Sequence, residues 1–221
     1  MKMIALAGLA FAGKDTFVGI AKNILLKNDY IPIRIAFADE LKTDIIPFIK
    51  EKYGIEVLTA SVEEKKMIRP LLVAHGCCKR AQTNGKYWVD KLDDRVKDYI
   101  ASNLYRPVNK IVFLCSDVRF ANEVEWCQKS WNGIVIHLKR WSYQEIRNGL
   151  GDFDTVKVYD SPPNKEEIEN DPIIQKMADY HVEWENAKKM TQEEAIKDPK
   201  LQEIVLDTLN STKYFSGKLL K

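Results

Sequence analysis

The chain has 221 residues, a formal net charge of +2 and 45% hydrophobic residues. This length favours one domain with a substantial core. The balanced charge argues for neither nucleic acid nor an anionic membrane, and we expect neither as a partner. No apolar run approaches the ~20 residues of a membrane-spanning helix. Four cysteines without metal or redox spacing indicate free thiols in a reducing compartment, so we expect a cytoplasmic protein.

The first segment with a functional motif is a glycine-bounded loop. An apolar run, Met3–Ala7, predicts a strand, and Phe17–Leu26 has the apolar spacing of a helix. Between them, Gly8–Thr16 has the spacing Gly-x-x-x-x-Gly-Lys, which in this context predicts a phosphate-binding loop. The loop amides and the start of the helix attract an anion. Lys14 adds a mobile cation for the outer phosphates of a nucleotide.

One position departs from the usual loop pattern. Asp15 follows the lysine, where Ser or Thr commonly helps to bind magnesium, and Thr16 comes one place later. We expect Asp15 to bind Mg²⁺ through water. Gly8, Ala12 and Gly13 complete the expected nucleotide-binding loop.

The next 90 residues predict one strand and several helices. Residues 31–37 read as a strand, and a helix from about Asp39 should stop at Gly54. Locally, Asp39 is as consistent with an N-cap as with a functional carboxylate. Ser61 and Glu64 form a capping box for a helix that we expect to reach Gly76. A further helix is predicted from about residue 87 to 104.

A buried strand at 110–115 leads to an acid and an arginine, Asp117 and Arg119. A strand at 134–138 ends in Lys139 and Arg140. Residues 141–178 contain several Gly and Pro residues and predict a loop-rich, lid-like segment. A fifth strand is expected at 178–184, and a capping box of Thr191 and Glu194 predicts the last helix.

Strands that alternate with helices predict an α/β fold of three layers, with a five-stranded parallel sheet flanked by helices. The carboxyl ends of parallel strands open on one edge, where such sheets bind ligands. The loop, Asp39, Asp117 and the pair Lys139–Arg140 should therefore meet there. Asp117 can hold magnesium, and Arg69, Arg80, Arg119 and Arg140 can clamp a second phosphate. An acceptor that is itself a phosphate needs no strong general base.

Four segments in this order resemble the phage-type deoxynucleoside monophosphate kinases, a branch of the P-loop nucleoside monophosphate kinase fold. They are Gly13–Thr16, Phe37–Lys42, Arg69-x-x-Leu72-x-x-x-Gly76 with Trp88 further on, and Ser116–Glu123. The resemblance covers most of residues 1–140 and thins through 141–178.

The resemblance implies a single P-loop kinase domain over residues 1–221, with a helical monophosphate-binding region at 38–108 and a lid at 141–178. It implies ATP- and Mg²⁺-dependent phosphorylation of a deoxynucleoside 5′-monophosphate, in the host cytoplasm if a phage encodes the chain. Lys14, Asp117, Arg119 and Arg140 would be catalytic. The implied residues of the monophosphate site are Asp39, Lys42, Arg69, Trp88 and Arg119. For Trp88, a place in the core is the alternative, and Arg147 and Lys157 are the only expected cations of a lid.

Other readings stay open. A dephospho-coenzyme A kinase-like or phosphomevalonate kinase-like enzyme shares much of the loop chemistry. A non-catalytic nucleotide-binding module is a second class, although the sequence has no Asn-Lys-x-Asp guanine motif. An accidental Gly-rich turn is the third. The base and sugar of the acceptor, the relative weight of Asp39 and Asp117 at the metal, and the oligomeric state, with a homodimer as one alternative, are left undecided.

Overall fold

The computed structural model describes residues 1–147, 153–160, 165–186 and 190–220. The chain divides into two compact units. The first unit comprises Met1–Arg34 and Pro107–Lys221, and the second comprises Ile35–Arg106. The second unit is therefore an insertion of the chain between two parts of the first.

A six-stranded sheet organises the first unit, with the strand order β2-β3-β1-β4-β5 and with β6 paired to β4. Strand β1 is parallel to both β3 and β4, β6 is parallel to β4, and β5 is antiparallel. The predicted α/β class with a mostly parallel sheet is confirmed, whereas the strand count of five, all parallel, is wrong by the antiparallel β5. The strands are β1 (Lys2–Ala7), β2 (Ile31–Ile35), β3 (Ile111–Val118), β4 (Ile134–Arg147), β5 (Phe153–Tyr159) and β6 (Tyr180–Glu185).

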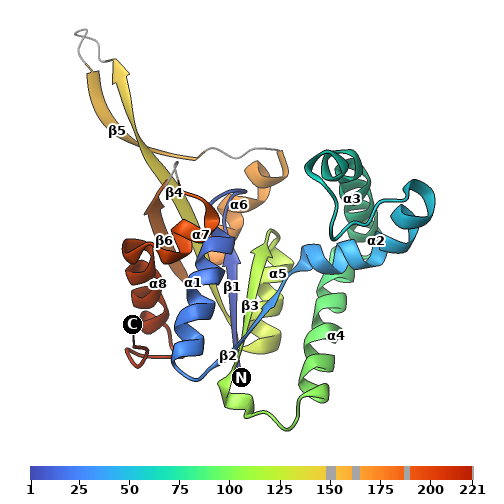
Figure 1. Cartoon of the computed structure of the whole chain (residues 1–221), viewed down its shortest axis with the longest axis horizontal. Helices are drawn as coiled ribbons and strands as arrows, with labels where there is room; N and C mark the ends of the chain where they lie inside the picture. Colours follow the sequence, from blue (N-terminus) through green and yellow to red (C-terminus); the bar gives the residue numbers. More distant parts are fainter. Residues whose placement is uncertain (148–152, 161–164, 187–189, 221) are drawn as a thin grey trace. The chain divides into compact units, whose positions relative to one another are not determined.

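Helices cover both faces of this sheet (Figure 1). On one face α1 (Lys14–Lys27) packs against α7 (Gln192–Lys197) and α8 (Pro199–Ser211). On the other face α5 (Ala121–Glu125) runs into a π-helical turn, η2 (Trp126–Ser130), and contacts α6 (Lys165–Met177). A short 3₁₀ turn, η1 (Val108–Lys110), precedes β3.

The apolar spacing of α1 explains its place in the core. Phe17, Ala21 and Ile24 recur at intervals of three and four residues and are buried against Ile4 and Leu6 of β1. The capping box of Thr191 and Glu194 is present and starts α7. The predicted single last helix is interrupted, because Asp198 caps a new helix that has Pro199 in its first turn.

The loop-rich prediction for 141–178 is wrong in the described residues, which form strands and a helix, and a lid role for this segment stays a prediction. Strand β4 continues past Leu138 and forms a hairpin with β5, from the pair Trp141–Tyr159 to the pair Arg147–Phe153. The hairpin extends beyond the rest of the sheet of the first unit (Figure 1). Pairing with β5 explains why the strand continues past Leu138. Gly149, Gly151, Pro162 and Pro163, on which the loop prediction depended, lie outside the described residues.

The second unit is helical. It contains α2 (Phe37–Tyr53), α3 (Val62–Gln82) and α4 (Lys86–Ser102), and Ile45, Ile49, Ile55, Val57, Ala60 and Ile68 form its apolar cluster. Gly54 ends α2 in a left-handed conformation, and Ser61 with Glu64 caps α3, both as predicted. The predicted end of α3 at Gly76 is wrong. Gly76 lies inside the helix, where a Cβ atom would meet Leu41 Cδ1 at 2.7 Å, so glycine serves the close approach of α2.

Candidate phosphate-binding site

The loop between β1 and α1 is shaped by two glycines and supported by two other strands. Gly8 and Gly13 have φ angles of +124° and +92°, which side chains disfavour. A Cβ atom on Gly8 would collide with the carbonyl oxygen of Leu138, and one on Gly13 would lie 2.5 Å from the Trp184 ring. The Trp184 indole N–H also donates to the Ala12 carbonyl at 2.8 Å. Strands β4 and β6 therefore hold the loop in one conformation.

Lys14 is the central cation of this loop. Its Nζ atom donates to the carbonyl oxygens of Gly8 and Leu9, each at 2.7 Å, and the residue is 8% exposed. Burial, and to a smaller extent the nearby Arg119 guanidinium, lower the pKa of Lys14 to about 8, against the opposing effect of the carboxylates of Glu167, Asp117 and Asp15. The loop curls around its own lysine, as a phosphate-binding loop should.

The end of β3 lies beside the loop. Val118 pairs with Ala7, the last residue of β1, and the half-buried Asp117 precedes it. Buried Glu123 accepts hydrogen bonds from the backbone N–H groups of Arg119 at 2.7 Å and Phe120 at 3.2 Å. Glu123 thereby fixes the turn that carries Arg119. In the sequence, Glu123 is only the last residue of the Ser116–Glu123 motif, and local pattern predicts no role for it.

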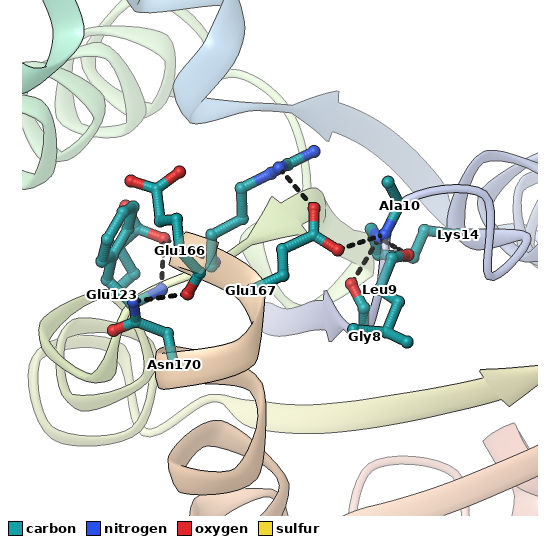
Figure 2. A network of polar contacts seen from close by, with 10 residues as sticks. Gly8, Leu9, Ala10, Lys14, Glu123, Glu166, Glu167 and Asn170 are labelled. Carbon is teal, nitrogen blue, oxygen red and sulfur yellow. Dashed lines mark hydrogen bonds and ion pairs between the residues drawn. The ribbon is translucent and has the colours of Figure 1, made fainter. Parts of the chain in front are cut away.

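A carboxylate from α6 also reaches the loop. Glu167 accepts a hydrogen bond from the backbone N–H of Ala10 at 2.8 Å and one from Arg119 Nη1 at 2.9 Å. Figure 2 shows its side chain directed at the loop. Sequence reasoning missed Glu167. The only sequence feature near it is the acidic start of a helix, which has no functional signature.

Two carboxylates are the predicted ligands of a magnesium ion. Asp15 is exposed in the first turn of α1, and both Asp15 and Asp117 act electrostatically on Lys14. No group of three or more His, Cys, Asp or Glu residues with metal-binding geometry occurs within the described ranges. One or two carboxylates suit Mg²⁺ at nucleotide sites, since water and substrate phosphates supply its remaining ligands. The donor set therefore fits Mg²⁺, and the roles of Asp15 and Asp117 stay predictions.

Arg140 and Thr16 are also in the first unit. Arg140 Nε donates to Asp160 Oδ2 at 2.5 Å, and the Asp160 N–H donates back to the Arg140 carbonyl at 3.0 Å. These contacts join the two strands at the base of the β4–β5 hairpin. Because β4 continues to Arg147, Arg140 lies inside this strand and not at its end. Thr16 is half-buried in α1. Lys157, an expected lid cation, pairs with Glu183 at 2.8 Å, and Arg147 is the last residue of β4.

The second unit contains a basic groove of its own. Its volume is about 560 Å³, and four cationic side chains, Lys42, Lys65, Lys66 and Arg69, line it together with Val57, Leu58, Val62, Ile68 and Leu72. Lys42 Nζ lies 3.4 Å from Asp39 Oδ1. The N-cap alternative for Asp39 is wrong, since Ala36 holds that position and Asp39 lies in the first turn of α2. Three of the predicted substrate residues are therefore neighbours within this unit.

The other two predicted substrate residues of this unit lie elsewhere. Trp88 is 1% exposed and donates its indole N–H to the Gly76 carbonyl at 3.2 Å, which confirms the core alternative. A base cannot stack on a side chain so buried, so that role is corrected. Arg80 is on the last part of α3, three turns after Arg69, and is not among the residues that line the groove. A substrate role for Arg80 stays a prediction.

Comparison with known proteins adds little to these observations. No family model and no curated protein sequence matches the chain. Among solved structures, shikimate kinase from Acinetobacter baumannii in complex with shikimate is 16% identical, with a TM-score of 0.40 over 96% of this chain and 95% of that one. Dephospho-CoA kinase from Campylobacter jejuni is also 16% identical, with a TM-score of 0.42 over 94% and 100%. Likenesses at such scores support no conclusion about the function of this chain.

None of the helices in the described part of the chain combines the length and apolarity needed to cross a membrane.

Proposed function

We propose that the chain is an ATP-dependent phosphotransferase that converts a deoxynucleoside 5′-monophosphate to the diphosphate. The main support for phosphotransfer is the geometry of the loop between β1 and α1. Lys14 is held by the Gly8 and Leu9 carbonyls, at the start of a helix and behind a buried strand. Loop N–H groups, a helix dipole and an ammonium group each attract an anion, and this arrangement brings all three into one short segment.

The residues of the loop have distinct roles in this proposal. Lys14 and the loop N–H groups bind the outer phosphates of the donor and stabilise the charge that develops on the transferred group. Arg119 offers a planar guanidinium to phosphoryl oxygens. Asp117, directly or through water, and Asp15, through water, would hold Mg²⁺, which would supply positive charge to the donor phosphates.

The basic groove of the second unit supports a phosphorylated acceptor. Lys42 and Arg69 lie in this groove, and the resemblance assigns both to the monophosphate site. An acceptor phosphate brings an oxygen that is already anionic, so the proposed reaction needs no histidine base. The choice of a deoxynucleoside monophosphate rests on the resemblance.

The deciding experiment is an acceptor panel with purified protein, ATP and Mg²⁺. It contains the deoxynucleoside and ribonucleoside monophosphates, dephospho-coenzyme A, phosphomevalonate and shikimate, and ADP formation is measured. We expect ADP formation to depend on a deoxynucleoside monophosphate. Turnover only with another acceptor would replace the substrate assignment. ATP binding without turnover on any acceptor would favour a non-catalytic nucleotide-binding module.

A further inference from the structure

One carboxylate in the first unit spans two donors of the kind that bind phosphate. Glu167 Oε2 accepts from the Ala10 N–H, and its Oε1 accepts from Arg119 Nη1. The side chain of Glu167 is 8% exposed. The adjacent Glu166 is exposed, and its carboxylate is turned away from the loop (Figure 2).

A phosphoryl group would use the same pair of donors. Backbone N–H groups of a glycine-bounded loop and an arginine fork both bind anionic oxygens through charge-assisted hydrogen bonds. The two oxygens of a carboxylate are joined to one carbon as two phosphoryl oxygens are joined to one phosphorus. Glu167 therefore accepts hydrogen bonds from the Ala10 N–H and from Arg119 as an anionic ligand would.

The carboxylate and a phosphate cannot share this position. The space between the loop and α6 is a cavity of about 10 Å³, lined in part by Gly8, Arg119, Glu166 and Glu167. Such a volume holds at most about one water molecule. A phosphoryl oxygen on the Ala10 N–H would also be in contact with Glu167 Oε2, and like charges at this distance repel.

The rest of α6 is attached to the sheet independently. Glu167, Asp171 and Ile174 lie on one face of the helix, at i, i+4 and i+7. Asp171 Oδ1 is 2.9 Å from His137 Nε2 on β4, and Ile174 is 2% exposed. Glu167 is in the first turn, so its side chain can leave the loop while Asp171 and Ile174 keep the helix in place.

We infer that Glu167 is a displaceable cover on the loop, which a triphosphate must remove from the Ala10 N–H and from Arg119 in order to bind. This inference rests on the proposed function and makes the affinity of the donor depend on a residue of α6. A ligand that competes with a covered state binds with an apparent affinity reduced by the uncovered fraction. The cover thus acts as an affinity-determining residue for the proposed reaction.

The test is calorimetric binding of inorganic triphosphate to wild type, Glu167→Gln and Glu166→Gln. Glu167→Gln keeps the shape and removes the charge, and we expect it to bind triphosphate about tenfold more tightly if roughly nine-tenths of the wild-type molecules are covered. Glu166→Gln removes the same charge one residue away and should stay within about twofold of wild type, which controls for long-range electrostatics.

The sign of the effect separates the alternatives. If Glu167 instead positions Arg119 for the ligand, Glu167→Gln binds triphosphate more weakly, and equal or weaker binding overturns the inference. Triphosphate binding by neither wild type nor Glu167→Gln contradicts the proposed phosphate loop itself. If Glu167→Gln binds triphosphate and wild type does not, the result supports both the phosphate loop and its cover by Glu167. If Glu167→Gln has no cooperative thermal transition, Glu167→Asp keeps the charge but is one methylene shorter, and it should still bind more tightly than wild type.

Hydrogen exchange at the Ala10 amide provides a second readout that general electrostatics would not produce. Without added triphosphate, this amide should be protected in wild type and in Glu166→Gln, and unprotected in Glu167→Ala. Added triphosphate should restore its protection in Glu167→Ala. Equal exchange in wild type and Glu167→Ala would show that the contact does not persist in solution and would overturn the inference.

Discussion

The phosphate loop of the first unit and the basic groove of the second unit contain similar charges in opposite surroundings. Lys14 is 8% exposed and is held by two carbonyls, and the glycines around it fit against Leu138 and Trp184. In the groove, Lys65, Lys66 and Arg69 are exposed, and Lys42 is half-buried beside Asp39. The loop is rigidly supported by the fold, whereas the groove is a solvated cluster of side chains.

This difference has energetic consequences. A buried cation is screened little by salt, and its geometry is fixed before the ligand arrives. Exposed cations gain less from each contact and lose side-chain entropy on binding. We therefore expect substitutions at the loop to change turnover and folding strongly, and substitutions at the groove to change mainly the affinity for an acceptor.

The largest effect should follow from Lys14→Met. The substitution removes the ammonium group from the transferred phosphate and keeps the length of the side chain, so kcat should fall by about 10²- to 10³-fold. Steady-state ADP formation with the preferred acceptor measures this. Lys22→Met, on an exposed position of the same helix, is the matched control and should keep wild-type turnover. If kcat of Lys14→Met falls less than fivefold, the loop does not take part in the chemical step.

Gly13→Ala should break the support of the loop. The new Cβ would lie 2.5 Å from Trp184 Cζ2, at a φ of +92°, so we expect a loss of about 3 kcal/mol in the free energy of unfolding. Gly217→Ala separates the effect of the positive φ from that of the contact with Trp184, because Gly217 has a φ of +76° and open space around it. It should lose only about 1 kcal/mol. Urea denaturation measures both, and equal losses would mean that Trp184 does not restrict this position.

The sequence predicted what depends on short-range pattern. The spacing from Gly8 to Lys14, the capping boxes at Ser61 and Thr191 and the buried strand before Asp117 each follow from a few consecutive residues. The partners that complete the site come from far along the chain. Ala10 meets Glu167 across 157 positions and Ala12 meets Trp184 across 172. No local pattern encodes such contacts.

Tertiary contacts also explain two wrong boundaries. Gly76 was expected to end a helix, but it serves the close packing of Leu41 inside α3. Strand β4 was expected to end before Lys139, but pairing with β5 extends it to Arg147. In both cases a partner elsewhere in the chain overrides the local signal.

Arg69→Gln tests the expectation that the groove affects mainly the affinity for the acceptor. The substitution removes one exposed cation, so KM for the acceptor should rise about tenfold and kcat should change less than threefold. The affinity for triphosphate should stay unchanged. Lys86→Gln, at an exposed position of α4 that does not line the groove, is the control for loss of one positive charge in this unit. A fall in kcat with constant KM would place Arg69 in the transition state instead.

The smallest effect concerns the titration of Lys14. Burial holds its pKa at about 8, and a bound phosphate favours the charged form, so binding takes up a proton as the pH rises through 8. Affinity for ATP is then greatest below this pKa and should fall about eightfold between pH 7.5 and 9, where the phosphates of ATP are already ionised. Calorimetry in buffers of different ionisation enthalpy measures both the affinity and the proton uptake. Lys14→Met should lose this pH dependence, and a pH-dependent affinity that persists in Lys14→Met would assign the titration to another group.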